Sequence, residues 1–153
     1  MSELSVERLK VYTPEDAAGI GKLMPILSDE FSGDPIPEEH LRGIINSPSH
    51  DQLVARAQGR IVGAATLSLI FGAGAQRKAW LEDFVSDPES GIKGVGQSLW
   101  DEMLVWCSER DTGLHFTSRA SREAAHKFYL KNGAEIRDTT VFVKTVFEEE
   151  GNG

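Results

Sequence analysis

The feature that most constrains the fold is a change of hydrophobic period at Asp87-Pro88. Before this point the chain carries three β-rich runs, joined by short glycine-containing turns, at residues 53–58, 60–71 and 78–86. Runs of this kind are typical of antiparallel strands. After it, apolar residues recur on one helical face over roughly four turns, at Val95, Leu99, Met103 and Trp106. The sequence therefore predicts a meander of strands followed by a long helix.

Shorter elements surround this meander. A capping hydroxyl followed by proline, Thr13-Pro14, predicts a helix that Pro25 should kink or end near Met24. We expect the other elements to be strands at 4–12, 114–117 and 134–147 and helices at 37–45 and 121–132. Asn132-Gly133 is a helix stop, because both residues tolerate a left-handed backbone. The order predicts an α/β (α+β) fold in which about four helices flank a mixed, mostly antiparallel sheet.

Length and charge exclude several classes of protein. The 153 residues fit one domain, which we place at 1–147, with a solvated acidic tail at 148–153. Sixteen Lys and Arg against twenty-four Asp and Glu give a net charge of −8, so nucleic acid is an unfavourable partner. No apolar run is long enough to span a membrane. Cys107 is the only cysteine and the four histidines lack metal-ligand spacing, so we expect a cytoplasmic protein without a metal.

The glycine-rich segment at residues 90–97 lies between the last strand of the meander and the long helix. Glycines let successive backbone amides point into one concavity, and a helix N-terminus adds partial positive charge, so an anion should bind there. The dinucleotide-binding and Walker patterns both fail, for want of the third glycine and of Gly-Lys-Ser/Thr. A local basic excess lies further on, where a solvated helix face is the alternative to a phosphate contact: Arg119, Arg122, Lys127 and Lys131 against Glu123.

Two segments in this order resemble the successive motifs of the GNAT superfamily of N-acetyltransferases. The first runs from Glu82-Asp83-Phe84-Val85 through the GIKGVG loop, and the second is REAAHKFYLKNG at residues 122–133. The element order agrees with the family over nearly the whole chain. The resemblance implies acetyl-CoA bound in a cleft between splayed parallel strands, here residues 80–86 and 114–117. It also implies an amine acceptor, and it is compatible with a homodimer.

The cofactor contacts that this resemblance implies are backbone contacts for the most part. The strand amides would pair with the pantetheine arm, the loop amides would hold the pyrophosphate, and basic side chains would reach the phosphates. The residues concerned are Phe84, Val85, Ser86, Gly91, Ile92, Lys93, Gly94, Val95, Gly96, Gln97, Arg122 and Lys131. The chain departs from the family pattern at Gly91, where Arg or Gln is usual, at Arg122, where Asn is frequent, and at Ala134, where a large apolar residue is common.

The catalytic residues implied are a proton acceptor and a proton donor. A primary amine with a pKa near ~10.4 must lose a proton before it attacks, and Glu82 is our first choice of base, with Asp83 second. Because they are neighbours on one strand, we expect their side chains to point to opposite faces. The amide of Phe84 or Val85 would stabilise the oxyanion. Tyr129 lies where the family commonly has its general acid.

Two other readings remain open. One is a catalytically weak acyl-CoA-binding regulatory module of the same fold, motivated by Gly91; the other is an unrelated phosphate-binding domain, which leaves the pattern at 122–133 unexplained. We expect an acetyl-CoA-dependent N-acetyltransferase acting on a small molecule, an amino acid or a peptide. The acceptor is not specified by the sequence.

Overall fold

A computed structural model describes residues 3–147, which form two compact units, one ending at Phe116 and the other beginning at Thr117. The first unit contains β1 (Ser5–Arg8), α1 (Pro14–Leu27), α2 (Glu38–Asn46), β2 (His50–Ala57), β3 (Arg60–Phe71), β4 (Arg77–Ser86), α3 (Val95–Glu109) and β5 (Leu114–His115). The second contains α4 (Glu123–Lys131). A single domain over 1–147 stays a prediction, and the acidic tail at 148–153 lies outside the described residues.

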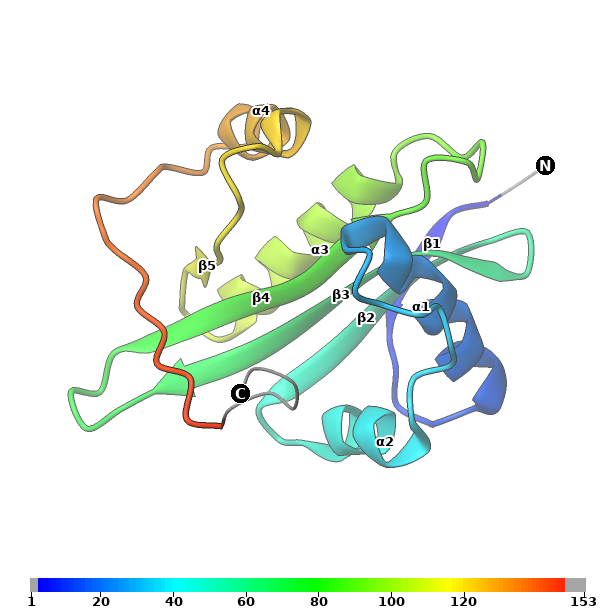
Figure 1. The fold of residues 1–153 in the computed structure, drawn as a ribbon, viewed down its shortest axis with the longest axis horizontal. Coiled ribbons are helices and arrows are strands. Elements are labelled where there is room, and N and C mark those ends of the chain that lie inside the picture. The colour runs from blue at the N-terminus through cyan, green and yellow to red at the C-terminus, as the bar shows by residue number, and fades with distance from the viewer. Residues whose placement is uncertain (1–2, 148–153) are drawn as a thin grey trace. The chain divides into compact units, whose positions relative to one another are not determined.

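The first unit is built on one five-stranded sheet with the order β1-β2-β3-β4-β5 (Figure 1). Neighbouring strands are antiparallel except for β4 and β5, which are parallel. Helices α1 and α2 cover one face of the sheet and α3 covers the other. The predicted α/β class and the mostly antiparallel sheet are thereby confirmed.

Helix α1 begins as the sequence predicts, because the Thr13 hydroxyl oxygen accepts a hydrogen bond from the Asp16 amide at 3.1 Å. It continues to Leu27, however, rather than ending near Met24. Pro25 lies in the last turn, so the loss of the hydrogen bond that its missing N–H would donate and the clash of its ring with the preceding turn affect only the end of the helix. Apolar residues of α1 and α2 pack on this face of the sheet against Leu9, Val54, Ala64 and Val85.

Helix α3 lies close against the other face. A Cβ added at Gly63 on β3 would lie 2.6 Å from Val95 Cγ1 and 2.9 Å from Leu99 Cδ1, so any larger residue would force α3 or these side chains to shift. Further along α3, the indole N–H of the fully buried Trp106 donates to the Asp51 carboxylate on β2 at 2.7 Å. The first turn of α3 is therefore held at a fixed place beside the end of β4.

The second unit differs from expectation after its helix. Gly133 has φ +90° and follows the last residues of α4, which confirms the predicted stop. The strands predicted at 134–147 are wrong: no strand is formed over these residues, and their large apolar side chains are exposed, among them Ile136, Val141, Phe142, Val143, Val146 and Phe147. A strand needs a hydrogen-bonded neighbour, and none of the described strands pairs with this segment.

Candidate functional site

The centre of the site is an irregularity in the pairing of β3 with β4. Thr66 pairs with Glu82 and Ala64 pairs with Val85, so two residues of β4, Asp83 and Phe84, lie opposite Ala65 alone. This arrangement is a β-bulge, and Asp83 has the left-handed φ of +51° that a bulge can require. Aspartate tolerates that backbone conformation better than most residues with a side chain.

The bulge changes which way the side chains of β4 point. Glu82 lies on the face of its pairing partner Thr66, because cross-strand partners share a face. Strict alternation would send Asp83 to the face of α3, yet Asp83 and Thr66 line the same pocket on the face of α1 and α2. The expectation that the two acids point to opposite faces is therefore wrong, since the extra residue interrupts the alternation.

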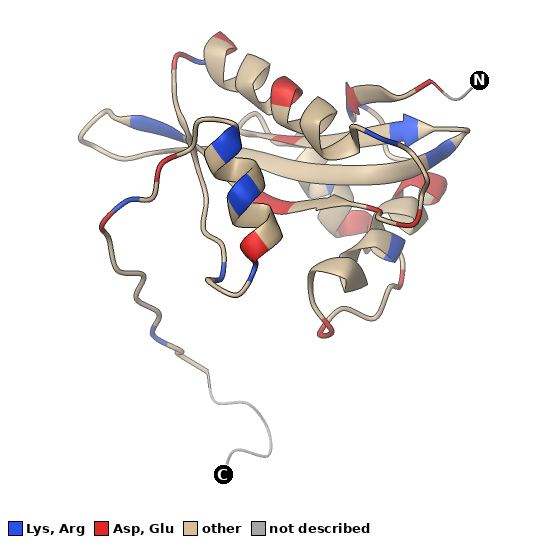
Figure 2. Cartoon of the chain, turned by 90° about the horizontal axis from the view of Figure 1, so that it is seen from above, with Lys and Arg blue, Asp and Glu red and all other residues tan. Residues whose placement is uncertain are grey.

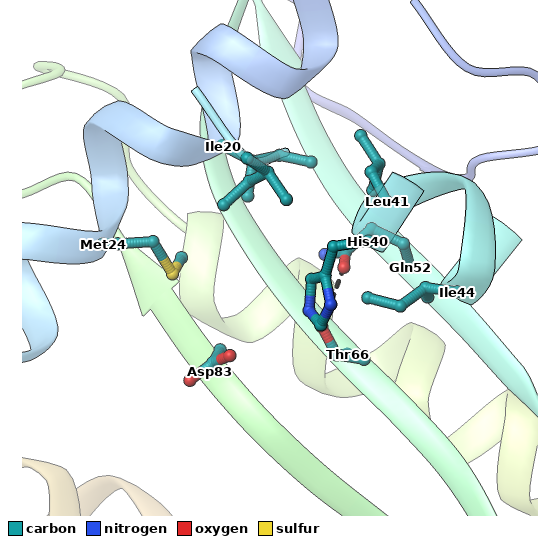
Figure 3. Close-up of a pocket in the computed structure, with 9 residues that line it drawn as sticks. Ile20, Met24, His40, Leu41, Ile44, Gln52, Thr66 and Asp83 are labelled. Atoms are coloured by element: carbon teal, nitrogen blue, oxygen red, sulfur yellow. Dashed lines mark hydrogen bonds between the residues drawn. The ribbon is translucent and has the colours of Figure 1, made fainter. Parts of the chain in front are cut away.

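The pocket beside Asp83 lies between the sheet and the two covering helices (Figure 3). Its cavity volume is about 40 Å³. Its walls are mostly apolar and come from α1, α2 and the segment between them, with polar groups from β2, β3 and β4; the lining residues are Ile20, Met24, Ile36, His40, Leu41, Ile44, Gln52, Thr66 and Asp83. The sheet thus presents a carboxylate to a small, largely apolar cavity.

The two acids differ in their surroundings. Loss of hydration beside the cavity raises the pKa of the Asp83 carboxyl, the negative charge of Glu82 raises it further, and His40 lowers it. Both residues are exposed, but the Glu82 carboxylate accepts a hydrogen bond of 2.7 Å from the Trp80 indole N–H, whereas Asp83 lines the pocket. Asp83, rather than Glu82, is the carboxylate in the cavity wall.

The glycine-rich loop and the start of α3 form a second feature of the same unit. Gly91 and Gly94 have φ values of +76° and +81°, and Gly94 is the N-cap of α3 with no side-chain hydrogen bond. Two hydrogen bonds hold the start of the loop. The Ser90 carbonyl accepts one from the Arg60 guanidinium at 3.1 Å, and the Ser90 hydroxyl accepts one from the Ile92 amide at 3.1 Å. A Cβ at Gly91 or Gly94 would have nothing within 4 Å, so the loop lies open on that side.

Strands β4 and β5 are paired over a short stretch. The pairs are Ala79 with Leu114 and Trp80 with His115, after which β4 continues to Ser86 without a further partner strand on that side among the described residues. The end of this divergent stretch lies beside α3, because a Cβ at Gly96 would lie 4.0 Å from the Phe84 ring and from the Ser86 hydroxyl. The end of β4, at Phe84, Val85 and Ser86, and the open loop at residues 91–97 are thus neighbours.

Helix α4 carries the remaining predicted residues and belongs to the other unit. Helix α4 contains Glu123, Lys127 and Lys131, and Figure 2 colours acidic residues red and basic residues blue along the chain. Burial raises the pKa of the Tyr129 hydroxyl, and Arg122 at the N-cap lowers it. Tyr129 also makes an edge-to-face contact with Phe128, with ring centroids 5.9 Å apart. Tyr129 is therefore protonated at neutral pH.

Sequence reasoning missed three residues of the pocket. These are the polar residues His40, Gln52 and Thr66, to which the sequence assigns no role; His40 is exposed and still lines the pocket. The usable signal is the spacing of His40, Leu41 and Ile44 on α2, which puts all three on one face of a helix. Gln52 and Thr66 could be found only from the strand register, which joins them as a pair.

Two searches of the described residues were negative. Residues 3–147 contain no group of three or more His, Cys, Asp or Glu side chains placed to hold a metal ion. Within the same range, every helix is too short or too polar to cross a bilayer.

Comparison with known proteins agrees with this geometry. Solved structures with the same fold include an aminoglycoside acetyltransferase from an uncultured soil metagenomic sample, in complex with trehalose, with a TM-score of 0.74 and 20% identity over 95% of this chain and 97% of that one. A Trypanosoma brucei acetyltransferase has a TM-score of 0.73 and 20% identity over 94% of this chain and 100% of that one. A transcriptional regulator from Bacillus halodurans has a TM-score of 0.74 and 17% identity over 95% and 100%.

The search of curated proteins found no match. The family model described as the acetyltransferase (GNAT) family matches residues 20–134, which include the bulge, the glycine-rich loop and α4. The chain belongs to the GNAT family of acetyltransferases.

Proposed function

We propose that this protein is an acetyl-CoA-dependent N-acetyltransferase whose acceptor is a primary amine. The observation that carries the proposal is the β-bulge at Asp83 and Phe84, which puts an acid into the wall of the pocket within the stretch of β4 that has diverged from β5. Acetyl transfer needs an acid that accepts the proton of the amine and, beside it, a strand end whose backbone groups can bind the thioester. Membership of the family supports the reaction class.

The proposed cosubstrate site follows the open end of β4 into the loop. Phe84, Val85 and Ser86 would offer backbone groups to the amides of the pantetheine arm, and residues 91–97 would hold the pyrophosphate with their N–H groups. Gly94 supports this assignment, because a glycine N-cap leaves room for an anion at the helix N-terminus. Lys93 and, in the second unit, Arg122 and Lys131 are the proposed cationic contacts. Acetyl-CoA supplies an activated acetyl thioester.

The proposed proton acceptor is Asp83, with Glu82 second, in reverse of the order that the sequence alone favours. Asp83 lines the cavity, and its raised pKa makes it a stronger base than an ordinary aspartate. It would take the ammonium proton, directly or through water, before the amine nitrogen forms its bond to the acetyl carbon. The C–S bond then breaks, and the departing sulfur needs a proton.

Tyr129 is the proposed donor of that proton. The phenol is protonated at neutral pH, so it can donate a hydrogen bond to the departing thiolate; its raised pKa makes this hydrogen bond more favourable than full proton transfer. After the C–N bond forms, the nitrogen loses a second proton, which replaces the proton that the sulfur takes. The products are an N-acetylated amine, free coenzyme A and one proton, which Asp83 returns to solvent. The buried Cys107, the chain's only cysteine, supports a cytoplasmic location.

A second candidate function is an acyl-CoA-binding regulatory module without appreciable turnover. Gly91 favours it, since this position offers the pyrophosphate no side chain. The Bacillus halodurans neighbour, described as a transcriptional regulator, has the same fold, and that description supports the candidate only by analogy.

One experiment separates these candidates. Coenzyme A release from acetyl-CoA is measured with a thiol reagent across a panel of alkylamines, amino acids, N-terminal peptides and aminoglycosides, and coenzyme A binding is measured by calorimetry. Release that depends on an amine supports the enzyme. Binding of coenzyme A with no release across the panel supports the regulatory module, and absence of binding contradicts both.

A further inference from the structure

The pocket beside Asp83 is small enough to restrict what enters it. Its volume of about 40 Å³ holds about three water-sized groups, because each needs roughly 10–15 Å³ by this measure. A methylene or methyl group is of similar size. The cavity is partly open, and Asp83 and His40 are exposed, but its enclosed part accepts the end of a short chain and is too small for a sugar ring.

The walls of the pocket favour an apolar occupant. Ile20, Met24 and Leu41 are buried, and Ile36 and Ile44 are partly buried beside them. Figure 3 shows the Ile20, Met24, Leu41 and Ile44 side chains around the cavity. Each methylene that leaves water for such a wall gains about 0.8 kcal/mol, which is about a fourfold change in an equilibrium constant.

The polar floor of the pocket is already satisfied. The buried Gln52 side chain donates through Nε2 to the Leu53 and Ala65 carbonyls at 3.2 Å each, and its Oε1 accepts from the Thr66 hydroxyl at 2.8 Å. The amide hydrogens and the hydroxyl hydrogen of this floor are thus committed to protein acceptors. An entering hydroxyl group would lose hydrogen bonds to water and find no free donor on this floor, which leaves it only Asp83 and His40 as polar partners in the pocket.

The charged groups of the pocket are Asp83 on β4 and the titratable His40 on α2. Figure 3 places their side chains on different walls, with Asp83 on the strand and His40 on the helix. His40 and Asp83 interact electrostatically. If the ammonium group of an amine binds at Asp83, the rest of the amine contacts the apolar walls of the pocket.

We propose that the acceptor site selects a primary amine with a short, unbranched aliphatic body of about three carbons, its ammonium group at Asp83 and its chain between α1 and α2. This inference rests on the proposed function and narrows its substrate class, since it disfavours aminosugars and other polyhydroxylated amines. Ile44 is the residue that we assign to setting the chain length.

The first test compares unbranched amines from methylamine to hexylamine, with glucosamine as the polyhydroxylated comparison. We expect kcat/KM to rise about fourfold per methylene up to about three carbons and then to level off. Direct binding of the same amines, measured by calorimetry without acetyl-CoA, should follow the same order. Equal values across the series, or a preference for glucosamine, would overturn the inference.

A pair of variants on α2 gives the second test. Ile44→Ala enlarges the pocket, so the levelling-off point should move to a longer chain. Ile45→Ala is the matched control, because Ile45 is the neighbouring isoleucine and packs on the core without lining the pocket. The control should keep the wild-type chain-length profile even if it lowers the melting temperature. An unchanged profile in Ile44→Ala, with its fold intact, would contradict the assignment.

The experiments distinguish failure of the proposed enzymatic function from failure of the proposed chain-length selection by the pocket. If alkylamines bind with the expected chain-length dependence but no thiol is released, the enzymatic function is wrong and the pocket assignment stands. If thiol is released with several amines regardless of chain length, the function stands and the pocket assignment is wrong. Asp83→Asn should weaken propylamine binding at least tenfold in the calorimetric arm, whatever the turnover.

Discussion

Glu82 and Asp83 are consecutive residues of one strand, and both lie on the face of the sheet that α1 and α2 cover. Glu82 lies on this face because it pairs with Thr66, and Asp83 lies on it because it lines the pocket. A regular strand cannot place two neighbours this way, because its side chains alternate. The β-bulge at Asp83 and Phe84 therefore gives the pocket an acid that β4 would otherwise turn toward α3.

The closeness of the two acids has an energetic consequence. The negative charge of Glu82 and the loss of hydration both raise the pKa of Asp83. A carboxyl whose pKa is higher in the folded protein than in the unfolded chain lowers stability once it is ionised. Asp83 is thus maintained at a cost to the fold, as functional residues often are.

We predict that Asp83→Asn raises stability and lowers activity at neutral pH. Asparagine keeps the size of the side chain and tolerates the left-handed backbone, while it removes the ionisation. The stabilisation should be present above the folded-state pKa of Asp83 and should vanish as the pH falls below the ordinary value of 3.8. Melting temperatures from pH 3 to 8 and amine-dependent thiol release measure the two effects.

The control for this variant is Glu39→Gln on α2, an exposed carboxylate outside the pocket lining. It should leave the rate unchanged and should not raise the melting temperature, because Glu39 lies in the first turn of α2, where a negative charge is stabilising. If Asp83→Asn is less stable than the wild type at pH 7 and equally active, Asp83 is a structural residue and Glu82 becomes the candidate base.

Gly94→Asp should abolish coenzyme A binding, with affinity reduced more than a hundredfold. The backbone there has φ +81°, and the new carboxylate would sit at the N-terminus of α3, where the pyrophosphate is proposed to bind. Gly94→Asn is the matched variant, because it has the same size and the same backbone strain without the charge. Calorimetry should show a much smaller loss for Asn. Equal losses would attribute the effect to backbone strain rather than to charge.

The sequence predicted much of the fold because its strongest patterns are local. The strand at 60–71 has the observed bounds of β3, and the helical spacing of Val95, Leu99, Met103 and Trp106 gives the buried face of α3. The glycines at 91 and 94 were expected to bend the backbone, and both have positive φ. Each of these features depends on residues that are close in the chain.

The missed features depend on distant partners. Nothing within β4 itself marks Asp83 as a bulge residue, because the bulge is a mismatch between the registers of β3 and β4. His40 lines the pocket only because α2 packs beside the sheet. The apolar run at 141–147 has strand-like composition, yet composition supplies no partner strand, and the run stays exposed. The roles of Tyr129, Arg122 and Lys131 remain predictions.

Tyr129→Phe should lower turnover about ten- to a hundredfold and leave coenzyme A affinity nearly unchanged. The substitution keeps the ring and its edge-to-face contact with Phe128, so packing is preserved. It removes a hydroxyl whose raised pKa keeps it protonated at neutral pH. Steady-state rates with acetyl-CoA and the best amine, beside calorimetry with coenzyme A, separate turnover from binding. Unchanged turnover would reassign Tyr129 to packing.

Gly63→Ala should destabilise the protein by about 1–3 kcal/mol, the usual range for an overpacked core. The new Cβ would lie 2.6 Å from Val95 Cγ1, 2.9 Å from Leu99 Cδ1 and 3.1 Å from the Val85 carbonyl oxygen, so α3 must move or the side chains must leave their rotamers. Val95→Ala removes the nearest methyl group, and the double variant should recover part of the loss in a double-mutant cycle. Urea unfolding measures all four proteins. Additive losses would show that Gly63 and Val95 do not meet, and that α3 is not held against β3 at this point.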